Sequence, residues 1–221
     1  MAERFEKPKK YTKEWFSYIW CYYKVHFFVI IAIIILSAVT ISEIKNKTDY
    51  DIRMVYCTTE NYSEAIDETL PERLKEEIED VNGDGEKHFL VSQLYFSGDI
   101  TGNSTQYTAS EEKLYALLSA EDEMLFVCDE FMMKHILGLG MTEDLFIPVS
   151  EWTDKETAES LGFNYAGATY AASLKNSSIF NEIAENENEI FIMVKDNIKP
   201  NDKKNCARFE ESKKIANKII K

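Results

Sequence analysis

The feature that most constrains this chain is an apolar run near its N-terminus. Residues Val25–Ser42 contain no Asp, Glu, Lys or Arg over 18 positions. As an α-helix the run would cover roughly 27 Å, which nearly matches a bilayer core of about 30 Å. A helix buried in a soluble protein normally keeps a polar stripe, and here isoleucines fall on every side. The run therefore predicts a transmembrane helix over residues 25–44.

The residues beside this run indicate its orientation. Six Lys or Arg side chains precede it, whereas only Lys45 and Lys47 follow closely. Positive side chains favour the cytoplasmic side of a membrane, and the aromatic residues between Trp15 and Tyr23 are typical of the headgroup level. We expect residues 1–24 to form a cytoplasmic and interfacial segment and residues 45–221 to form an extracytoplasmic domain. A cleaved signal peptide would also export the domain, but no A-x-A-like cleavage site follows the run.

Charge separates the chain into the same two parts. The formal net charge is −14, of which residues 1–44 contribute +2 and residues 45–221 contribute −16. Nucleic-acid binding depends on basic side chains that neutralise phosphates, so the acidic excess argues against a nucleic-acid partner. The partners we expect are the lipid bilayer, through residues 25–44, and a membrane protein complex.

The exported part alternates short apolar runs with amphipathic stretches, which is the pattern of an α/β domain. We expect one domain with a mostly parallel sheet and helices on both faces. Strands joined by helices run parallel, and the first three are expected in the order 2-1-3. The predicted strands are Asp51–Thr58, His88–Phe96, Met124–Cys128, Thr169–Leu174 and Glu189–Lys195.

Capping patterns predict where helices begin. Thr69 and Glu72 are spaced as a capping box, and Thr108 and Glu111 repeat that spacing. Pro71 fits the first turn of a helix, so we expect the first of these helices to restart near Thr69.

The C-terminal segment predicts one more helix, which begins at Asn201 or Asp202. Its buried face is expected to carry Cys206, Phe209, Ala216 and Ile219, with lysines on the solvated side.

One segment resembles a known family. Residues Leu117–Glu130 (LLSAEDEMLFVCDE) are similar to the helix, turn and strand with a polar cap that occur in type 2 periplasmic-binding-like domains. The β-α-β-α-β-α order and the later strand at Tyr170–Leu174 extend the resemblance to about 130 residues. The resemblance implies a solute-binding domain on a single-pass anchor, a layout similar to that of single-pass membrane proteins of Gram-positive anaerobes.

Two strand ends supply the candidate ligand site. In the order 2-1-3 the carboxyl ends of the first and third strands lie side by side, where doubly wound folds bind ligands. This places Cys57 and Thr58 beside Cys128 and Asp129 as candidate ligand-binding residues. We expect both thiols to be reduced, because adjacent parallel strands seldom offer disulfide geometry. Small buried hydrophobic side chains are nevertheless the default interpretation of the two cysteines.

A second candidate is a weak calcium site. Asp80, Asn82 and Asp84 occupy positions 1, 3 and 5 of a calcium-loop pattern, with Gly85 at position 6. Val91 stands at position 12, where such a loop needs a bidentate acid. A helix-to-strand turn is therefore the favoured interpretation, and no other cofactor is indicated.

The sequence favours a non-enzymatic binding or accessory protein anchored outside the cytoplasm. It has no G-x-S-x-G, H-E-x-x-H, P-loop or G-x-G-x-x-G motif. The alternative is an anchored hydrolase or redox enzyme that uses Cys128, with His135 as a conceivable partner, or the acidic residues around the third strand. We expect those acidic residues, at 121–123, 129 and 130, to form a solvated rim.

Overall fold

The computed structural model describes residues 10–46, 48–59, 64–96, 105–140, 142–165, 167–183, 189–196 and 199–221. The chain divides into two compact units, one ending at Thr48 and one beginning at Asp49.

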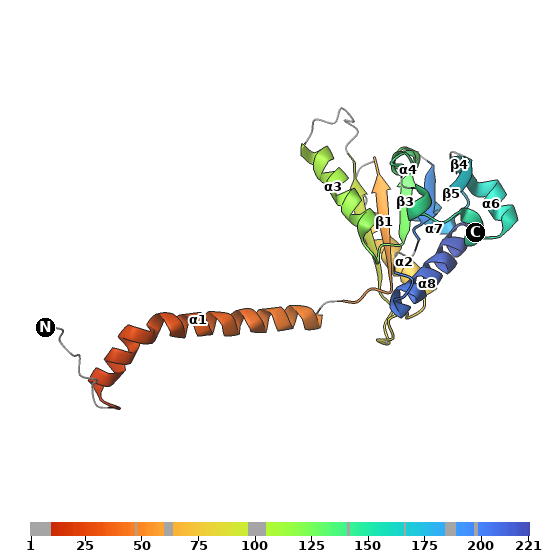
Figure 1. The fold of residues 1–221 in the computed structure, drawn as a ribbon. Coiled ribbons are helices and arrows are strands. Elements are labelled where there is room, and N and C mark those ends of the chain that lie inside the picture. Colours follow the sequence, from red (N-terminus) through yellow and green to blue (C-terminus); the bar gives the residue numbers. More distant parts are fainter. Residues whose placement is uncertain are drawn as a thin grey trace. The chain divides into compact units, whose positions relative to one another are not determined.

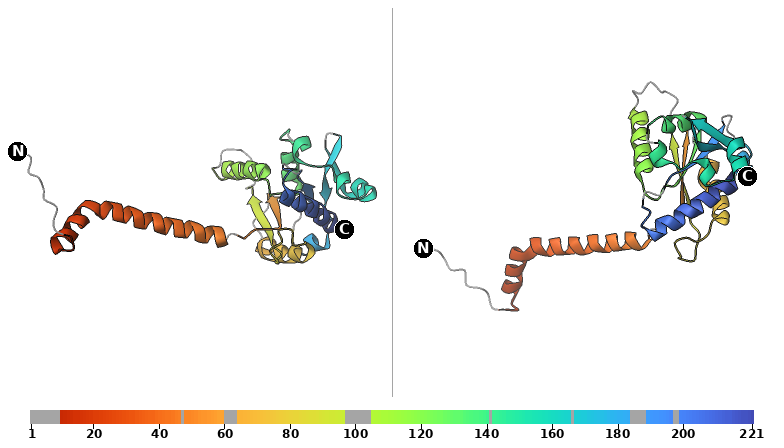
Figure 2. Two further views of the ribbon diagram at one scale, coloured as in Figure 1. Left: turned by 60° about the horizontal axis from the view of Figure 1, so that its bottom comes forward. Right: turned by 45° about the vertical axis from the view of Figure 1, so that its right-hand side comes forward.

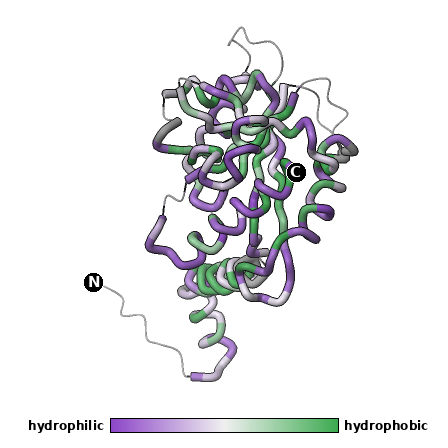
Figure 3. Tube along the Cα trace, turned by 90° about the vertical axis from the view of Figure 1, so that its right-hand side faces the viewer, coloured by the Kyte–Doolittle hydropathy of each residue, from purple (hydrophilic) through white to green (hydrophobic). Residues whose placement is uncertain are grey.

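The first unit is a long helix. Helix α1 spans Lys13–Asn46, and Tyr23–Ser42 within it has a mean hydropathy of 2.6. None of this stretch is buried, and its isoleucine side chains are broadly exposed. In Figure 3 it is the mostly green helix. Among the described residues this is the one helix long and apolar enough to cross a membrane.

The second unit is built on a six-stranded sheet with the order β2-β1-β3-β6-β5-β4 (Figure 1). Strands β1 (Ile52–Thr58), β2 (Phe89–Tyr95) and β3 (Leu125–Asp129) match the first three predicted strands. β1 pairs in parallel with both β2 and β3. The predicted order 2-1-3 is therefore confirmed.

The other half of the sheet corrects the expectation of a mostly parallel arrangement. β6 (Ile190–Val194) runs antiparallel to β3 and to β5 (Ala168–Ser173), and β4 (Gly162–Tyr165) runs antiparallel to β5. Helix α7, between β5 and β6, has only six residues, or about 9 Å. It is too short to return the chain along a strand of about 20 Å, so β6 begins at the end where β5 finishes and the sheet is mixed.

Helices cover both faces of the sheet, as predicted (Figure 2). The first face carries α2 (Glu64–Glu77), α7 (Ser178–Ile183) and α8 (Lys203–Ile219), and the second carries α3 (Thr105–Ser119) and α4 (Glu130–Leu137). The short helices α5 (Thr142–Leu145), η1 (Val149–Glu151) and α6 (Lys155–Leu161) connect β3 to β4.

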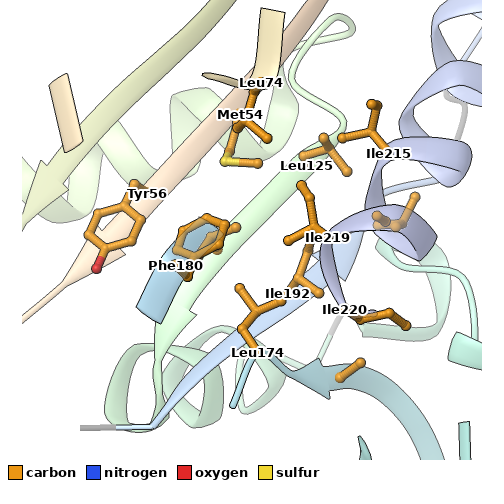
Figure 4. Packing of buried hydrophobic residues seen from close by; sticks show 14 of the residues in the cluster. Met54, Tyr56, Leu74, Leu125, Leu174, Phe180, Ile192, Ile215, Ile219 and Ile220 are labelled. Carbon is orange, nitrogen blue, oxygen red and sulfur yellow. The ribbon is translucent and has the colours of Figure 1, made fainter. Parts of the chain in front are cut away.

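Alternation along β1 divides the core into two clusters. Met54 and Tyr56 join the cluster under α2, α7 and α8, and Val55 and Cys57 join the cluster under α3 and α4. Figure 4 shows the first cluster, with Phe180 beside Tyr56 at the centre. Burial of apolar area on both faces, at about 25 cal/mol per Å², is the main favourable contribution to folding.

Two predicted helix starts are wrong by several residues. α2 begins at Glu64 and runs through Pro71, and α3 begins at Thr105 rather than near Thr108. Pro71 removes one backbone hydrogen bond from α2. The fully buried Leu70 and Leu74 on either side of it compensate by anchoring the helix to the sheet.

The predicted face of α8 is correct in its last turns and wrong in its first. Ala216 and Ile219 are buried, and Asp202 is the N-cap as expected. In the first half, Asn205 and Arg208 are buried, whereas Cys206 is only partly buried; Phe209 is also partly buried but packs against the first core cluster as predicted. Arg208 turns inward because its guanidinium donates to the Asp49 carboxylate and to the Tyr50 carbonyl oxygen, at 2.6 and 2.5 Å.

Candidate functional site

The four predicted ligand-binding residues meet at the carboxyl ends of β1 and β3. Cys57 and Cys128 are partners in the parallel register, so their strands lie about 4.8 Å apart. Both cysteines are free thiols with no exposed surface, in the core under α3 and α4. Thr58 and Asp129 follow them directly at the strand ends.

The Asp129 carboxylate is already engaged by its neighbours. Oδ1 accepts the backbone N–H of Met132 at 2.8 Å and so caps helix α4. Oδ2 accepts the backbone N–H and the hydroxyl of Thr59, at 2.5 and 2.7 Å, and the Thr58 hydroxyl lies 3.4 Å away. Asp129 is 4% exposed. The carboxylate therefore joins the end of β1 to the start of α4.

The Cys128 thiol is poorly suited to nucleophilic chemistry. Burial raises the pKa of the Cys128 thiol well above its ordinary value, and the hydrogen bond with Cys57 raises it further. A protonated, buried thiol behaves as a small hydrophobic side chain. His135, considered as a partner for Cys128, bonds elsewhere.

His135 belongs to a polar group that the sequence did not reveal. Its Nε2 lies 2.8 Å from Glu111 Oε1, which also accepts the Tyr107 hydroxyl at 3.3 Å. Burial is the main reason that the pKa of Tyr107 is raised, and Glu111 adds to it. Phe131 stacks on the imidazole ring. Glu111 had been assigned to a capping box, and only the packing of α3 against α4 brings it to His135.

The calcium-loop pattern folds as a tight turn between α2 and β2. Asp80 accepts the backbone N–H groups of Gly83 and Gly85, at 2.6 and 2.9 Å. Asn82 accepts that of Asp84 at 2.8 Å. Gly83 and Gly85 have positive φ angles of 76° and 89°, which favour glycine. Within the described ranges, no group of three or more His, Cys, Asp or Glu side chains is arranged to hold a metal ion.

The buried side chain of Asp51 holds this turn in place, a role that the sequence analysis did not identify. Its carboxylate has no exposed surface and accepts three backbone N–H groups, from Val81, Asn82 and His88, at 2.8 to 2.9 Å. A single Asp before a strand carries no distinctive pattern, so the sequence offers little signal for it.

Four of the five acidic residues around β3 are ion-paired, and the prediction of a solvated rim is wrong for two of the five. Glu123 and Asp129 are buried, Glu123 beside Arg53 and Asp129 against the backbone N–H of Met132. Arg53 contacts Asp122 and Glu123 at 3.3 and 3.5 Å, and burial raises the pKa of Glu123. The others pair at the surface, Glu121 with Lys199 and Glu130 with Lys134.

Lys195 is a buried cation near the opposite end of β3. Its ammonium group donates to the carbonyl oxygens of Leu118, at 3.1 Å, and Ala120, at the end of α3. It also lies 5.9 Å from the centre of the Phe126 ring. Burial lowers the pKa of Lys195 to about 8, against the opposing effect of Glu123 and Asp122.

Two surface hollows lie away from the strand ends. One, of about 420 Å³, lies between the η1 region and α8 and is lined by Trp152, Thr153, Asp154, Lys213, Asn217 and Lys221 among others. The other, of about 450 Å³, lies between α2 and Ile179 and is lined mainly by Glu72, Arg73, Glu76 and Glu77. Neither is lined by Cys57, Thr58, Cys128 or Asp129.

Comparison of the chain with protein-family models, with curated proteins and with solved structures gives no match.

Proposed function

We propose that this protein is a single-pass membrane protein whose acidic α/β domain acts outside the cytoplasm as a non-enzymatic binding or accessory module. The N-terminus lies in the cytoplasm, and the partner is a membrane protein complex or a small ligand. The observation that carries the proposal is the apolar stretch Tyr23–Ser42, which is wholly exposed and directly precedes a separately folded unit.

Exposure of this stretch supports a membrane environment. A core helix of a soluble protein would bury its apolar side chains, whereas Ile33 is 58% and Leu36 is 71% exposed. Leaving so many large aliphatic side chains in water is unfavourable by roughly 1.5–3 kcal/mol for each one. A bilayer removes that penalty.

The point at which the chain enters the domain supports a partner-binding role for the carboxyl ends of β1 and β3. Asp49, the first residue of the domain, is bound by Lys204 and Arg208 of α8, next to the start of β1. β1 then runs seven residues, or about 23 Å, before it reaches Thr58. The carboxyl ends of β1 and β3 therefore lie at the end of the sheet opposite the one at which the chain enters the domain.

The topology of the strands supports the same edge. The chain passes from β1 to β2 through α2, on one face of the sheet, and from β2 to β3 through α3, on the other face. The connections that follow β1 and precede β3 therefore lie on opposite faces, and the chain diverges between these two neighbouring strands. Doubly wound folds bind their ligands at such a divergence. The type 2 periplasmic-binding-like resemblance remains part of this proposal.

An enzymatic role receives less support. The thiol of Cys128 is buried and protonated, and both carboxylate oxygens of Asp129 accept hydrogen bonds, from Thr59 and from Met132. Neither group is available to a substrate in the described arrangement.

Protease protection tests the membrane topology. We expect protease added outside intact cells to degrade residues 45–221 and to leave an N-terminal tag protected. The same tag should stay in the membrane fraction after alkaline carbonate washing. Degradation of the tag with protection of the domain would refute the orientation, and release by carbonate would refute the anchor.

Partner capture tests the binding role. The full-length protein is purified from its own membranes after mild cross-linking and compared with two charge-reversal variants, Glu130→Arg and Glu86→Arg. Each glutamate is exposed and pairs with one neighbour, Lys134 or His88. Glu130 begins α4 at the proposed edge, and Glu86 lies in the turn before β2, at the end of the sheet where β1 begins. We expect the first variant to lose the partner and the second to retain it. Equal recovery from both would exclude the proposed edge.

A further inference from the structure

The first three turns of α1 differ from the span that follows them. Between Lys13 and Lys24 the polar side chains recur at intervals of three or four residues, at Lys13, Ser17, Cys21 and Lys24. At 100° per residue these positions fall within one narrow stripe, with Glu14 at its margin. The stripe ends at Lys24, because the corresponding later positions are Phe28 and Ile31.

The rest of this segment's circumference is aromatic or aliphatic. It carries Trp15, Phe16, Tyr18, Ile19, Trp20 and Tyr23. Phe16 is 60%, Trp20 55% and Tyr23 52% exposed in α1. A broad aromatic face opposite a narrow cationic stripe is the pattern of a helix that lies in the membrane interface rather than across it.

The path of α1 agrees with this division. The N-terminal, red part of the helix runs at an angle to the remainder in each view (Figures 1 and 2). The Trp20 ring lies 6.1 and 6.0 Å from the rings of Phe27 and Phe28, seven and eight residues later. A straight helix separates such residues by about 10.5 to 12 Å along its axis. The close approach of these rings fits the bend seen in the figures, by which the pre-span segment and the span are not coaxial.

We infer that residues Lys13–Lys24 form an amphipathic helix that binds the anionic headgroup layer of the leaflet from which the span departs. The aromatic face is immersed at the boundary between headgroups and acyl chains. Lys10, Lys13 and Lys24 contact lipid phosphates. Aromatic rings favour this depth, and basic side chains near it are attracted to anionic lipids. This inference rests on the membrane anchoring proposed above.

Tryptophan quenching in the full-length protein tests the inference, because Trp15 lies on the aromatic face and Trp20 lies at the border between that face and the polar stripe. The protein is reconstituted into vesicles of phosphatidylcholine and phosphatidylglycerol whose lipids carry bromine either near the headgroup or near the chain ends. The variant W15F/W20F leaves only Trp152, which is buried in the domain, and supplies the background to subtract. A third protein, W15F/W20F/S17W, places one indole in the polar stripe instead.

We expect headgroup-side bromine to quench Trp15, isolated by the variant W20F, several-fold more than the indole at position 17, and aqueous acrylamide to show the reverse order, with Trp20 between the two. Omission of phosphatidylglycerol, or the variant K13Q/K24Q, should weaken the bromine quenching. Equal acrylamide quenching at all three positions would overturn the inference, and so would strongest quenching by chain-end bromine. Flotation and carbonate washing of the same sample come first, because release of the protein at that stage refutes the anchor itself rather than the interfacial helix.

Discussion

Asp129 binds Thr59 twice, through the backbone N–H at 2.5 Å and the hydroxyl at 2.7 Å, and both bonds reach the same carboxylate oxygen, Oδ2. The residues are 70 positions apart in the chain. Their contact holds the chain just after β1 against the C-terminal end of β3, where α4 begins. The geometry of the proposed binding edge therefore depends on one carboxylate.

Replacement of Asp129 by alanine should destabilise the domain by about 2–3 kcal/mol. The change removes a helix cap, worth about 1 kcal/mol, and leaves partly buried donors without an acceptor, at about 1–3 kcal/mol. Asp129→Asn should lose less, since its amide oxygen still accepts one bond. Urea unfolding of the full-length protein in detergent measures both.

Asp154→Ala is the matched control for this variant. Asp154 caps α6 at an exposed site, by accepting the N–H of Thr157 three residues later, as Asp129 accepts that of Met132, and it also accepts the Thr157 hydroxyl and pairs with Lys221. We expect a smaller loss from it than from Asp129→Ala. Equal losses would show that burial of the Asp129 carboxylate adds nothing.

Lys195 should make stability depend on pH in the alkaline range. Its pKa in the folded protein is lowered to about 8 from 10.5. Below pH 8 the folded state holds a buried charge that the unfolded state exposes to water, and above about 10.5 the amine is neutral in both states. The unfolding free energy contributed by this group therefore rises between pH 8 and about 10.5, by about 3 kcal/mol at most.

The variant Lys195→Met isolates that contribution from the other groups that titrate in this range. It also removes the donor to Leu118 and Ala120, but that loss does not change with pH. We expect the stability difference between the parent protein and the variant to shift in favour of the parent as the pH rises. A pH-independent difference would mean that the amine is not buried.

The four cysteines should separate into two classes of reactivity. Cys57 and Cys128 have no exposed surface, whereas Cys21 is exposed and Cys206 partly so. We expect a thiol reagent to modify Cys21 and Cys206 rapidly in the native detergent-solubilised protein, and Cys57 and Cys128 only on unfolding. Differential alkylation with mass spectrometry assigns each site. Rapid native modification of Cys128 would revive the enzymatic alternative.

Calcium should leave the turn at residues 80–86 unaffected. The oxygens of Asp80, Asn82 and Asp84 accept backbone N–H groups of the turn itself. We expect no binding heat with millimolar Ca²⁺ and no change in Tm. Asp80→Ala should lower Tm, with or without the ion, because Gly83 and Gly85 lose their acceptor. A calcium-dependent rise in Tm that this variant abolishes would establish a metal site.

Local pattern was sufficient for the first half of the sheet and insufficient for the second. Alternation in β1 and the crossovers through α2 and α3 determine parallel pairing, so the register neighbours Cys57 and Cys128 followed from sequence. The direction of β6 depends on the length of α7, and residues 174–189 contain enough chain for either a parallel or an antiparallel return. Strand β4 is only four residues long and leaves too short a pattern to detect.

In the candidate site, too, some side-chain contacts could be predicted from the sequence and others could not. Proximity of Thr58 and Asp129 was predictable from strand order, but the bonds of Asp129 to Thr59 were not, since they depend on the path of the chain after β1. Buried polar groups such as Asp51, Lys195 and Arg208 were missed for a related reason. Each is buried because its side chain forms hydrogen bonds with backbone groups of distant segments. The spacing of hydrophobic residues along the sequence does not reveal such bonds.

The direct connection between the tether and β1 has a mechanical consequence. With the anchor proposed above, a pull on the chain would enter the domain at the N-terminal end of β1, which has parallel neighbours on both sides. The component of that load along β1 would shear the hydrogen bonds of both ladders together, instead of opening them one by one. Arg208 and Lys204, bound to Asp49, attach the point of entry to α8 as well as to the sheet.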